Sequence, residues 1–208
     1  ARPRYIAPMR LVDLLSKVPS VVREGQGDAQ VTGLVDDSRK VTPGALFVAR
    51  GGAKADGGSF IADAIAKGAV AVVAAPGVAV PAGVAVARAA NPALAAAELA
   101  HAFHGFPARS LKVAGVTGTN GKTTIAFLLQ QCMAQAGQRY GLIGTVQIDD
   151  GARKVNSELT TPGAIELAAL LARMRDNDCT GVSMETSSHA LDQGRVAGID
   201  FAVGIFTN

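Results

Sequence analysis

The sequence predicts an α/β fold in two parts: a small N-terminal α/β domain, followed by a central domain with a mainly parallel sheet. Short apolar segments of strand length alternate with segments of helical periodicity along the chain. Apolar residues make up 49% of the sequence and aromatic residues only 4%, so aliphatic side chains must fill the core. The 24 glycines would let helices lie close on a sheet.

The first hundred residues carry both periodicities. Apolar segments of strand length are expected to form strands; they cover residues 31–35, 45–49 and 69–75. Segments with apolar residues at helical spacing are expected to form helices; they cover residues 9–18, 59–67 and 92–104. Gly68 is suited to stop the second helix, and Asn91 and Pro92 are suited to the N-cap and first turn of the third.

Residues 103–110 interrupt both periodicities, because they contain Gly105 and Pro107. We therefore place a domain boundary there, which gives an N-terminal domain of residues 1–108 and a central domain of residues 109–208. In the second domain we expect strands over 112–116, 140–146, 182–185 and 201–206, and helices over 122–136 and 161–176. Thr161 suits a helix N-cap and Pro162 the first helical position. Such strand–loop–helix alternation favours a mainly parallel sheet.

Composition argues against several classes of function. The formal net charge is +3 and aromatic residues are scarce, so we expect no nucleic-acid partner. The longest apolar runs are too short to cross a bilayer and no signal peptide is visible, so we expect no membrane insertion. Cys132 and Cys179 lack a metal-type spacing and have apolar neighbours, which predicts a reduced, cytoplasmic protein. We further expect a monomer.

One segment between an apolar strand and an apolar helix has the pattern of a phosphate-binding loop, namely Gly118-Thr119-Asn120-Gly121-Lys122-Thr123-Thr124. Its glycines let successive backbone N–H groups point at phosphate oxygens, and the helix N-terminus adds partial positive charge. Lys122 can reach the terminal phosphates, and the Thr123 hydroxyl can ligate Mg²⁺. The segment therefore predicts a P-loop for a nucleoside triphosphate, most simply ATP with Mg²⁺.

The loop departs from the general G-x-x-x-x-G-K-[ST] pattern. Val116 stands at the position of the first glycine, Gly115 comes one residue early, and Gly118 is an extra glycine inside the loop. A tight strand–helix turn with a surface lysine is the plainer alternative for these residues. The strand before the loop and the helix after it favour phosphate binding over that alternative.

With this loop, the sequence resembles the Mur ligases, the ATP-dependent amino-acid ligases of peptidoglycan synthesis. Further segments carry the same resemblance. In the first domain they are Asp37-Ser38-Arg39, Pro43-Gly44, residues 46–49, and Asp56-Gly57 with Phe60. In the second domain they are Thr160-Thr161-Pro162, residues 184–191 with Gln193 and Arg195, and Phe206-Thr207-Asn208. The set is most similar to the members that add the third amino acid of the peptide.

The resemblance implies roles for single residues. It implies that Lys122 and Glu185 carry catalysis, with Glu185 and Thr123 as Mg²⁺ ligands. The residues implied to contact the UDP-N-acetylmuramoyl-peptide are Ser38, Lys54, Thr160, Thr161, Ser187, Gln193 and Arg195. A carboxylate suits a hard cation, and an arginine can pair bidentately with a carboxylate or phosphate. Plainer roles stay open, with Glu185 as a turn cap, Ser38 in an ordinary turn and Arg195 as a surface charge.

Two other groups of residues invite functional interpretations. Ser187-Ser188-His189 suggests a hydrolase, but adjacent Ser and His rarely face each other and no G-x-S-x-G elbow surrounds them. His101 and His104 are three residues apart and suggest a metal pair. Without a third ligand nearby, we interpret them as histidines at a helix C-terminus, where cations are favoured.

The resulting hypothesis is an ATP-dependent acid–amino-acid ligase in peptidoglycan synthesis. Its partners would be UDP-N-acetylmuramoyl-L-alanyl-D-glutamate and a diamino acid, meso-diaminopimelate or L-lysine, joined through an acyl phosphate. We expect residues 1–108 to bind the UDP-MurNAc-peptide and residues 109–208 to form a truncated ATP-binding domain. The C-terminal ligase domain would be absent and the piece inactive alone. The alternatives are a ligase similar to folate polyglutamate synthase, and a non-catalytic P-loop module.

Overall fold

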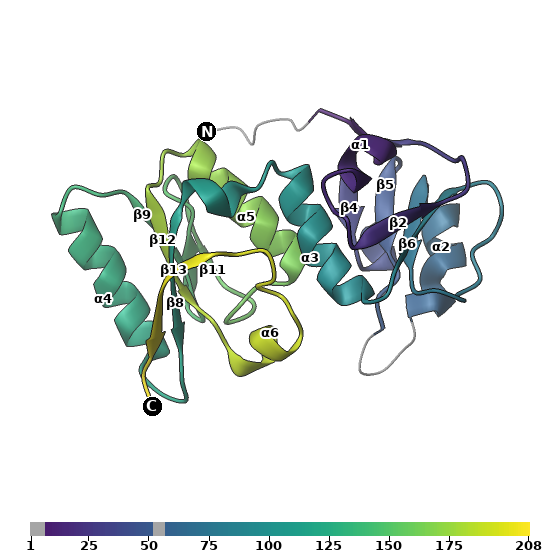
Figure 1. Cartoon of the computed structure of the whole chain (residues 1–208). Helices are drawn as coiled ribbons and strands as arrows, with labels where there is room; N and C mark the ends of the chain where they lie inside the picture. The colour runs from purple at the N-terminus through teal and green to yellow at the C-terminus, as the bar shows by residue number, and fades with distance from the viewer. Residues whose placement is uncertain (1–6, 52–56) are drawn as a thin grey trace. The chain divides into compact units, whose positions relative to one another are not determined.

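The computed structural model describes residues 7–51 and 57–208 (Figure 1). Lys54 and Asp56, which the sequence singles out, lie outside the described residues. The chain divides into two compact units between Phe103 and His104. Each unit is a mixed α/β structure built around a mainly parallel sheet, which confirms the predicted fold class.

The N-terminal unit contains a five-stranded sheet in the order β2-β7-β6-β5-β4. Its strands are β2 (Val21–Glu24), β4 (Gly33–Val35), β5 (Ala45–Val48), β6 (Ala71–Ala74) and β7 (Ala85–Ala89). Strands β4 to β7 are parallel, and β2 pairs antiparallel with β7. A separate two-stranded ladder joins β1 (Met9–Arg10) to β3 (Gln30–Val31). The helices are α1 (Leu11–Leu15), α2 (Ile61–Ala66) and α3 (Pro92–Phe103), with 3-10 turns at Ser38–Lys40 and Gly57–Phe60.

Alternation of side chains along the central strands gives this sheet two apolar faces. Phe47 and Val72 pack in one cluster with Ile61 of α2. In Figure 1, α2 and α3 lie on opposite sides of this sheet. The Asn91 side chain accepts hydrogen bonds from the backbone N–H groups of Ala93 and Leu94, at 3.1 and 3.2 Å, so it caps α3 as predicted.

The second unit contains a six-stranded sheet in the order β11-β10-β9-β12-β8-β13. Its strands are β8 (Lys112–Thr117), β9 (Tyr140–Ile143), β10 (Gln147–Asp149), β11 (Lys154–Asn156), β12 (Gly181–Glu185) and β13 (Phe201–Phe206). Strands β9, β12, β8 and β13 are parallel, and β10 and β11 add an antiparallel edge. Helices α4 (Lys122–Gln135) and α5 (Ala164–Asp176) cover opposite faces (Figure 1), and a short α6 spans Ser188–Asp192.

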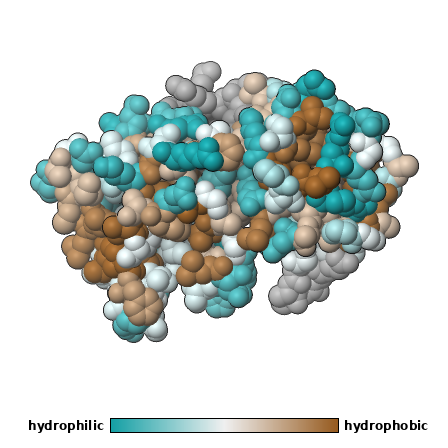
Figure 2. All heavy atoms as spheres, in the orientation of Figure 1, coloured by the Kyte–Doolittle hydropathy of each residue, from teal (hydrophilic) through white to brown (hydrophobic). Residues whose placement is uncertain are grey.

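The two covering helices of this unit differ in burial. Helix α5 buries seven residues against the sheet, among them Leu167, Leu171 and Met174. In α4 only Ala126 is fully buried. Strand β13 is an edge strand, and Phe206 at its end is 75% exposed. Figure 2 shows apolar side chains gathered over α4 and β13.

Several sequence expectations need correction. The predicted helix start at Thr161 and Pro162 is wrong, because α5 begins at Ala164 with Gly163 as its N-cap. Thr161 is instead drawn into hydrogen bonds with Glu185 and Ser187, which compete with a capping role. The predicted strand 31–35 is interrupted at Thr32. The short elements β2, β7, β10, β11 and α6 were not predicted.

No helix in residues 7–51 and 57–208 combines the length and apolarity that a bilayer span requires.

The two cysteines differ in burial, although both have apolar neighbours in the sequence. Cys132 is exposed on α4, while Cys179 is buried, and burial raises the pKa of the Cys179 thiol to about 11. Cys132 therefore does not have the apolar surroundings that its neighbours in the sequence indicated.

His101 has a different role from the one predicted. It is 1% exposed, and neither ring nitrogen has a hydrogen-bond partner within the described part of the chain. Burial lowers the pKa of His101 from 6.5 to about 4. The imidazole is therefore neutral at pH 7, and the interpretation of His101 as a cation at the helix end is wrong.

This burial predicts an acid-sensitive N-terminal unit. Between pH 6.5 and 4 the unfolded chain binds a proton at His101 more readily than the folded chain, so the free energy of unfolding falls as the pH drops through that range. The loss should reach about 3 kcal/mol. Urea unfolding at pH 7 and pH 4.5 measures it, and His101→Phe should remove most of this pH dependence. An unchanged pH dependence in His101→Phe would contradict the assignment.

Candidate functional site

The candidate site lies where four parallel strands of the second unit end. Strands β8, β9, β12 and β13 run in one direction, so the segments that follow them share one edge of the sheet. The segments are Gly118–Gly121 after β8, Gly144 and Thr145 after β9, Thr186 and Ser187 after β12, and Thr207 and Asn208 after β13. In Figure 1 this edge is the lower end of the sheet, at the start of α4.

The loop between β8 and α4 depends on two glycines with positive φ. Gly118 has φ +131° and Gly121, the N-cap of α4, has φ +81°. Residues other than glycine rarely adopt these backbone angles. A Cβ at Gly118 would also lie 2.2 Å from Thr207 Oγ1, so there is no room for one. The extra glycine in the pattern is therefore required by both the backbone angle and the close approach of β13.

The residues after β13 hold the tip of this loop. The Asn208 side-chain oxygen accepts hydrogen bonds from the N–H groups of Thr119 and Asn120, at 3.0 and 2.9 Å. The Thr207 hydroxyl lies within hydrogen-bond distance of the carbonyl oxygens of Thr117 and Asn120, at 3.2 and 2.5 Å, and its one proton can be shared between them. Two consecutive loop N–H groups thus converge on a single oxygen atom, which is the geometry that a phosphate oxygen also satisfies.

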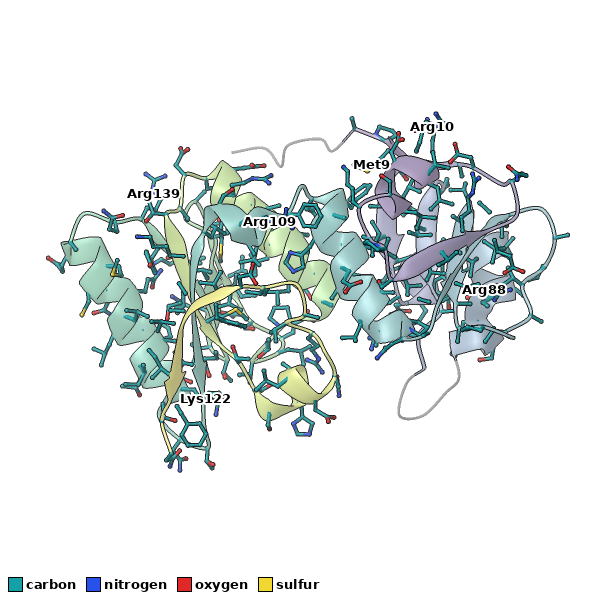
Figure 3. The ribbon with its side chains drawn as sticks, viewed as in Figure 1. Met9, Arg10, Arg88, Arg109, Lys122 and Arg139 are labelled. Carbon is teal, nitrogen blue, oxygen red and sulfur yellow. The ribbon has the colours of Figure 1, made fainter. Side chains whose placement is uncertain are left out.

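Lys122 is the first residue of α4 and turns back over the loop. Its Nζ donates to the carbonyl oxygens of Gly118 and Thr119, at 2.7 and 3.2 Å (Figure 3). The ammonium group therefore stands beside the loop N–H groups and the N-terminus of a fourteen-residue helix. Thr123 is the next residue and is partly buried in the first helical turn. The combination gives this corner of the sheet positive charge and several hydrogen-bond donors.

Glu185 ends β12 and is 1% exposed. Its Oε1 accepts a hydrogen bond from the Thr145 N–H at 2.8 Å, and its Oε2 accepts one from the Thr145 hydroxyl at 3.0 Å. Over residues 7–51 and 57–208, no lysine or arginine forms an ion pair with this carboxylate. The carboxylate thus caps the turn after β9, the plainer role considered for it, and its charge is not neutralised by a cationic side chain there.

Thr161 joins Glu185 to the segment that starts α6. Its hydroxyl donates to the Glu185 carbonyl oxygen at 2.8 Å and accepts from the Ser187 N–H at 3.1 Å. Thr161 is 1% exposed, so water cannot replace these bonds easily. Ser187 in turn caps α6, because its hydroxyl accepts from the Ala190 N–H at 3.2 Å. Ser187 thus has a capping role.

Arg195 is fixed by two neighbours. Its Nη1 donates to the Thr161 carbonyl oxygen at 2.9 Å, and its Nε and Nη2 both donate to Gln193 Oε1, at 2.9 and 2.7 Å. These bonds place the guanidinium beside the Thr160-Thr161 segment. Thr160, Thr161, Glu185, Ser187, Gln193 and Arg195 thus belong to one hydrogen-bond network.

Ser38 lies in the N-terminal unit, apart from this network in the sequence and in a different unit. It is 7% exposed at the start of a 3-10 turn that the Asp37 side chain caps. Its carbonyl oxygen accepts from Lys67 Nζ at 3.2 Å. Hydrogen bonding from Arg39 lowers the pKa of Asp37 to about 2, so this carboxylate stays ionised and forms an ion pair with Arg39.

Sequence reasoning missed Thr145, which binds Glu185. It noted Thr207 and Asn208 for their resemblance alone and not for the hydrogen bonds by which they hold the loop after β8. Their common signal is position, since each follows the end of a parallel strand. No group of three or more metal-binding side chains occurs within the described residues, and His101 and His104 form no part of one.

Both units of the chain are similar to known proteins. Residues 30–104 match the model of the Mur ligase family, catalytic domain, and residues 116–208 match the model of the Mur ligase middle domain. The UDP-N-acetylmuramoyl-L-alanyl-D-glutamate–2,6-diaminopimelate ligase of Cytophaga hutchinsonii is 43% identical over 202 residues, which are 96% of this chain and 42% of that protein. The ligase of the same name from Geobacillus thermodenitrificans is 42% identical over 200 residues, 96% of this chain and 40% of that protein.

Solved structures are similar as well. A structure of a UDP-N-acetylmuramoyl-L-alanyl-D-glutamate–2,6-diaminopimelate ligase has a TM-score of 0.69 and 28% identity, over 86% of this chain and 36% of that one. The UDP-N-acetylmuramoylalanyl-D-glutamyl-2,6-diaminopimelate–D-alanyl-D-alanyl ligase from Acinetobacter baumannii has a TM-score of 0.64 and 18% identity, over 97% of this chain and 42% of that one. At this identity the likeness shows the fold alone. The chain spans about two fifths of the length of the curated relatives it matches.

The role of Thr161 in the network predicts a stability effect. Thr161→Val leaves the buried Glu185 carbonyl and the Ser187 N–H without their partner, so the free energy of unfolding should fall by about 1–3 kcal/mol. Thr161→Ser keeps both bonds and should cost less. Urea unfolding followed by circular dichroism measures both variants. Equal stability of Thr161→Val and wild type would refute the role of the hydroxyl.

Proposed function

Because the chain belongs to the Mur ligase family, we propose that it supplies the nucleotide- and substrate-binding parts of an ATP-dependent ligase of peptidoglycan synthesis. The ligase would add the third amino acid to UDP-N-acetylmuramoyl-L-alanyl-D-glutamate. The observation that carries this proposal is the single network that joins Thr160, Thr161 and Arg195 to Glu185, beside the loop from Gly118 to Thr124.

The incoming amino acid that we propose is a 2,6-diaminopimelate. The relatives in Cytophaga hutchinsonii and Geobacillus thermodenitrificans carry this compound in their names, at 43% and 42% identity. L-Lysine is the other diamino acid considered from the sequence. The domain roles follow the same proposal, with the N-terminal unit for the UDP end of the substrate, through Ser38, and the second unit for ATP.

The reaction has two steps. A D-glutamate carboxylate oxygen attacks the γ-phosphorus of ATP, which forms an acyl phosphate and releases ADP. The amine of the diamino acid then attacks the acyl carbon, forms the amide bond and expels inorganic phosphate, while the amine loses a proton. Phosphoryl transfer depends mainly on positioning and charge neutralisation. Lys122 and the loop N–H groups would bind and orient the phosphates, and Arg195 would orient an anionic group of the muramoyl-peptide.

The residues present fit a divalent cation at Glu185. The carboxylate is buried, its hydrogen bonds come only from the neutral Thr145, and no ion pair to it occurs in the described parts of the chain. Together with the Thr123 hydroxyl it offers the oxygen donors that Mg²⁺ prefers. Mg²⁺ bound there would neutralise charge on the transferring phosphoryl group. A cytoplasmic location is part of the same proposal, since UDP-activated precursors and ATP are the proposed substrates. We also propose a monomer.

One prediction of the proposed function concerns the lysine of the loop. Lys122→Ala removes the cation that would meet the terminal phosphates, so the Kd for ATP should rise about 10- to 100-fold in isothermal titration calorimetry. Lys112→Ala is the matched control, because Lys112 is exposed at the opposite end of β8. Comparable ATP affinity in Lys122→Ala and Lys112→Ala would argue against a phosphate site at the loop.

A further prediction separates this ligase from its alternatives. The protein should bind UDP-N-acetylmuramoyl-L-alanyl-D-glutamate as well as ATP, and Arg195→Met should weaken binding of the muramoyl-dipeptide while leaving ATP binding within about twofold of wild type. Calorimetry with each ligand measures both. A folded protein that binds ATP but not the muramoyl-dipeptide would instead be a nucleotide-binding module or a different ligase.

A further inference from the structure

The turn after β9 holds Glu185 with unusual specificity. One residue, Thr145, binds both oxygens of the carboxylate, through its backbone N–H at 2.8 Å and its hydroxyl at 3.0 Å. The residue before it makes room for this arrangement, because a Cβ on Gly144 would lie 2.5 Å from Glu185 Oε1. Two donors on one residue fix both the position and the plane of a carboxylate, as a single hydrogen bond cannot.

The donor and the acceptor of each hydrogen bond at Thr145 can be assigned. The Thr145 hydroxyl lies 3.0 Å from Glu185 Oε2 and also 3.0 Å from the Thr160 hydroxyl, but it carries only one proton. An ionised carboxylate can only accept, and hydrogen bonds to it are stronger than those to a neutral hydroxyl. Thr145 therefore donates its hydrogen bond to Glu185 and accepts a hydrogen bond from the Thr160 hydroxyl. The result is a chain that runs from Thr160 through Thr145 to Glu185.

We propose that Thr145 is a positioning residue, which aims the Glu185 carboxylate at the divalent cation and ties it to Thr160 of the substrate-binding segment. This inference rests on the proposed function, because it takes Glu185 as a cation ligand. Each carboxylate oxygen uses one lone pair for Thr145 and keeps another for a metal ion. Groups that orient a metal ligand without touching the metal have large effects on affinity, typically about 10- to 100-fold.

A purely structural role for Thr145 predicts something different. If Thr145 served only to close the turn, its loss would lower stability and leave the metal dependence of nucleotide binding as it was. If it aims Glu185, its loss would act on that dependence itself. The backbone N–H of Thr145 survives any side-chain substitution, so the turn keeps one of its two bonds to Glu185. The hydroxyl can therefore be tested while the fold is retained.

The experiment compares ATP binding in Mg²⁺ and in EDTA by calorimetry. In Thr145→Val the Mg²⁺ concentration for half-maximal enhancement of ATP affinity should rise about 10- to 100-fold, with the affinity in EDTA unchanged. Thr145→Ser keeps the hydroxyl and should behave as wild type. Gly144→Ala keeps both donors but should displace the carboxylate and shift the Mg²⁺ dependence in the same direction. If circular dichroism shows that Thr145→Val does not fold, the Mg²⁺ dependence of Gly144→Ala tests the positioning role in its place.

The outcomes separate this inference from the proposed function. If wild type shows Mg²⁺-enhanced ATP binding and Thr145→Val and Gly144→Ala show the same Mg²⁺ dependence, the positioning role is overturned and the proposed function stands. A Thr145→Val variant that loses affinity equally in Mg²⁺ and EDTA also overturns it. If wild type binds ATP equally in Mg²⁺ and in EDTA, the cation site at Glu185 fails and the inference fails with it. A shift in Thr145→Val that Thr145→Ser lacks supports the positioning role.

Discussion

The parallel pairing of β12 and β13 with β8 is the constraint on which the site depends. Its register places Glu185 opposite Val116 and Phe206 opposite Thr117. Because parallel strands end at one edge, the segments that follow them meet there, although the sequence separates Thr207 from Thr117 by 90 positions. The loop, the carboxylate and the threonine pair need no dedicated scaffold beyond this register. The apolar core behind the edge, with Val182, Met184 and Leu171, keeps the register in place.

The buried carboxylates at the two ends of this sheet have different partners. At the end away from the site, Asp149 pairs with Lys154 and Asp150 with Arg173, so these largely buried carboxylates meet cationic side chains. At the site end, Glu185 is more deeply buried, yet within residues 7–51 and 57–208 its side-chain hydrogen bonds come from the neutral Thr145. Leaving a buried carboxylate with neutral donors alone is costly for a protein, and this contrast within one sheet is in keeping with the cation site proposed at Glu185.

Strong local signals made much of this predictable from sequence. The alternation of apolar segments gave the parallel core, and the glycine loop gave the start of α4 at Lys122. Thr161 shows the limit, because its cap-like pattern with Pro162 was real but the hydroxyl found partners 24 and 26 residues away. Short edge strands such as β11 carry too few residues for a periodicity to be visible. Thr145 could not be identified because its role exists only once β9 and β12 are neighbours.

The hold of Asn208 on Thr119 and Asn120 has a consequence for how this protein acquires its loop. The contact joins residues 89 positions apart, and closing such a loop of chain costs conformational entropy. Other contacts offset this cost only after the intervening strands have paired. A ribosome releases β8 and the loop long before Asn208. During synthesis the loop must therefore wait, with its N–H groups hydrated, until the last of these strands docks beside β8. The order of the chain therefore makes the proposed phosphate site one of the last parts of this unit to form.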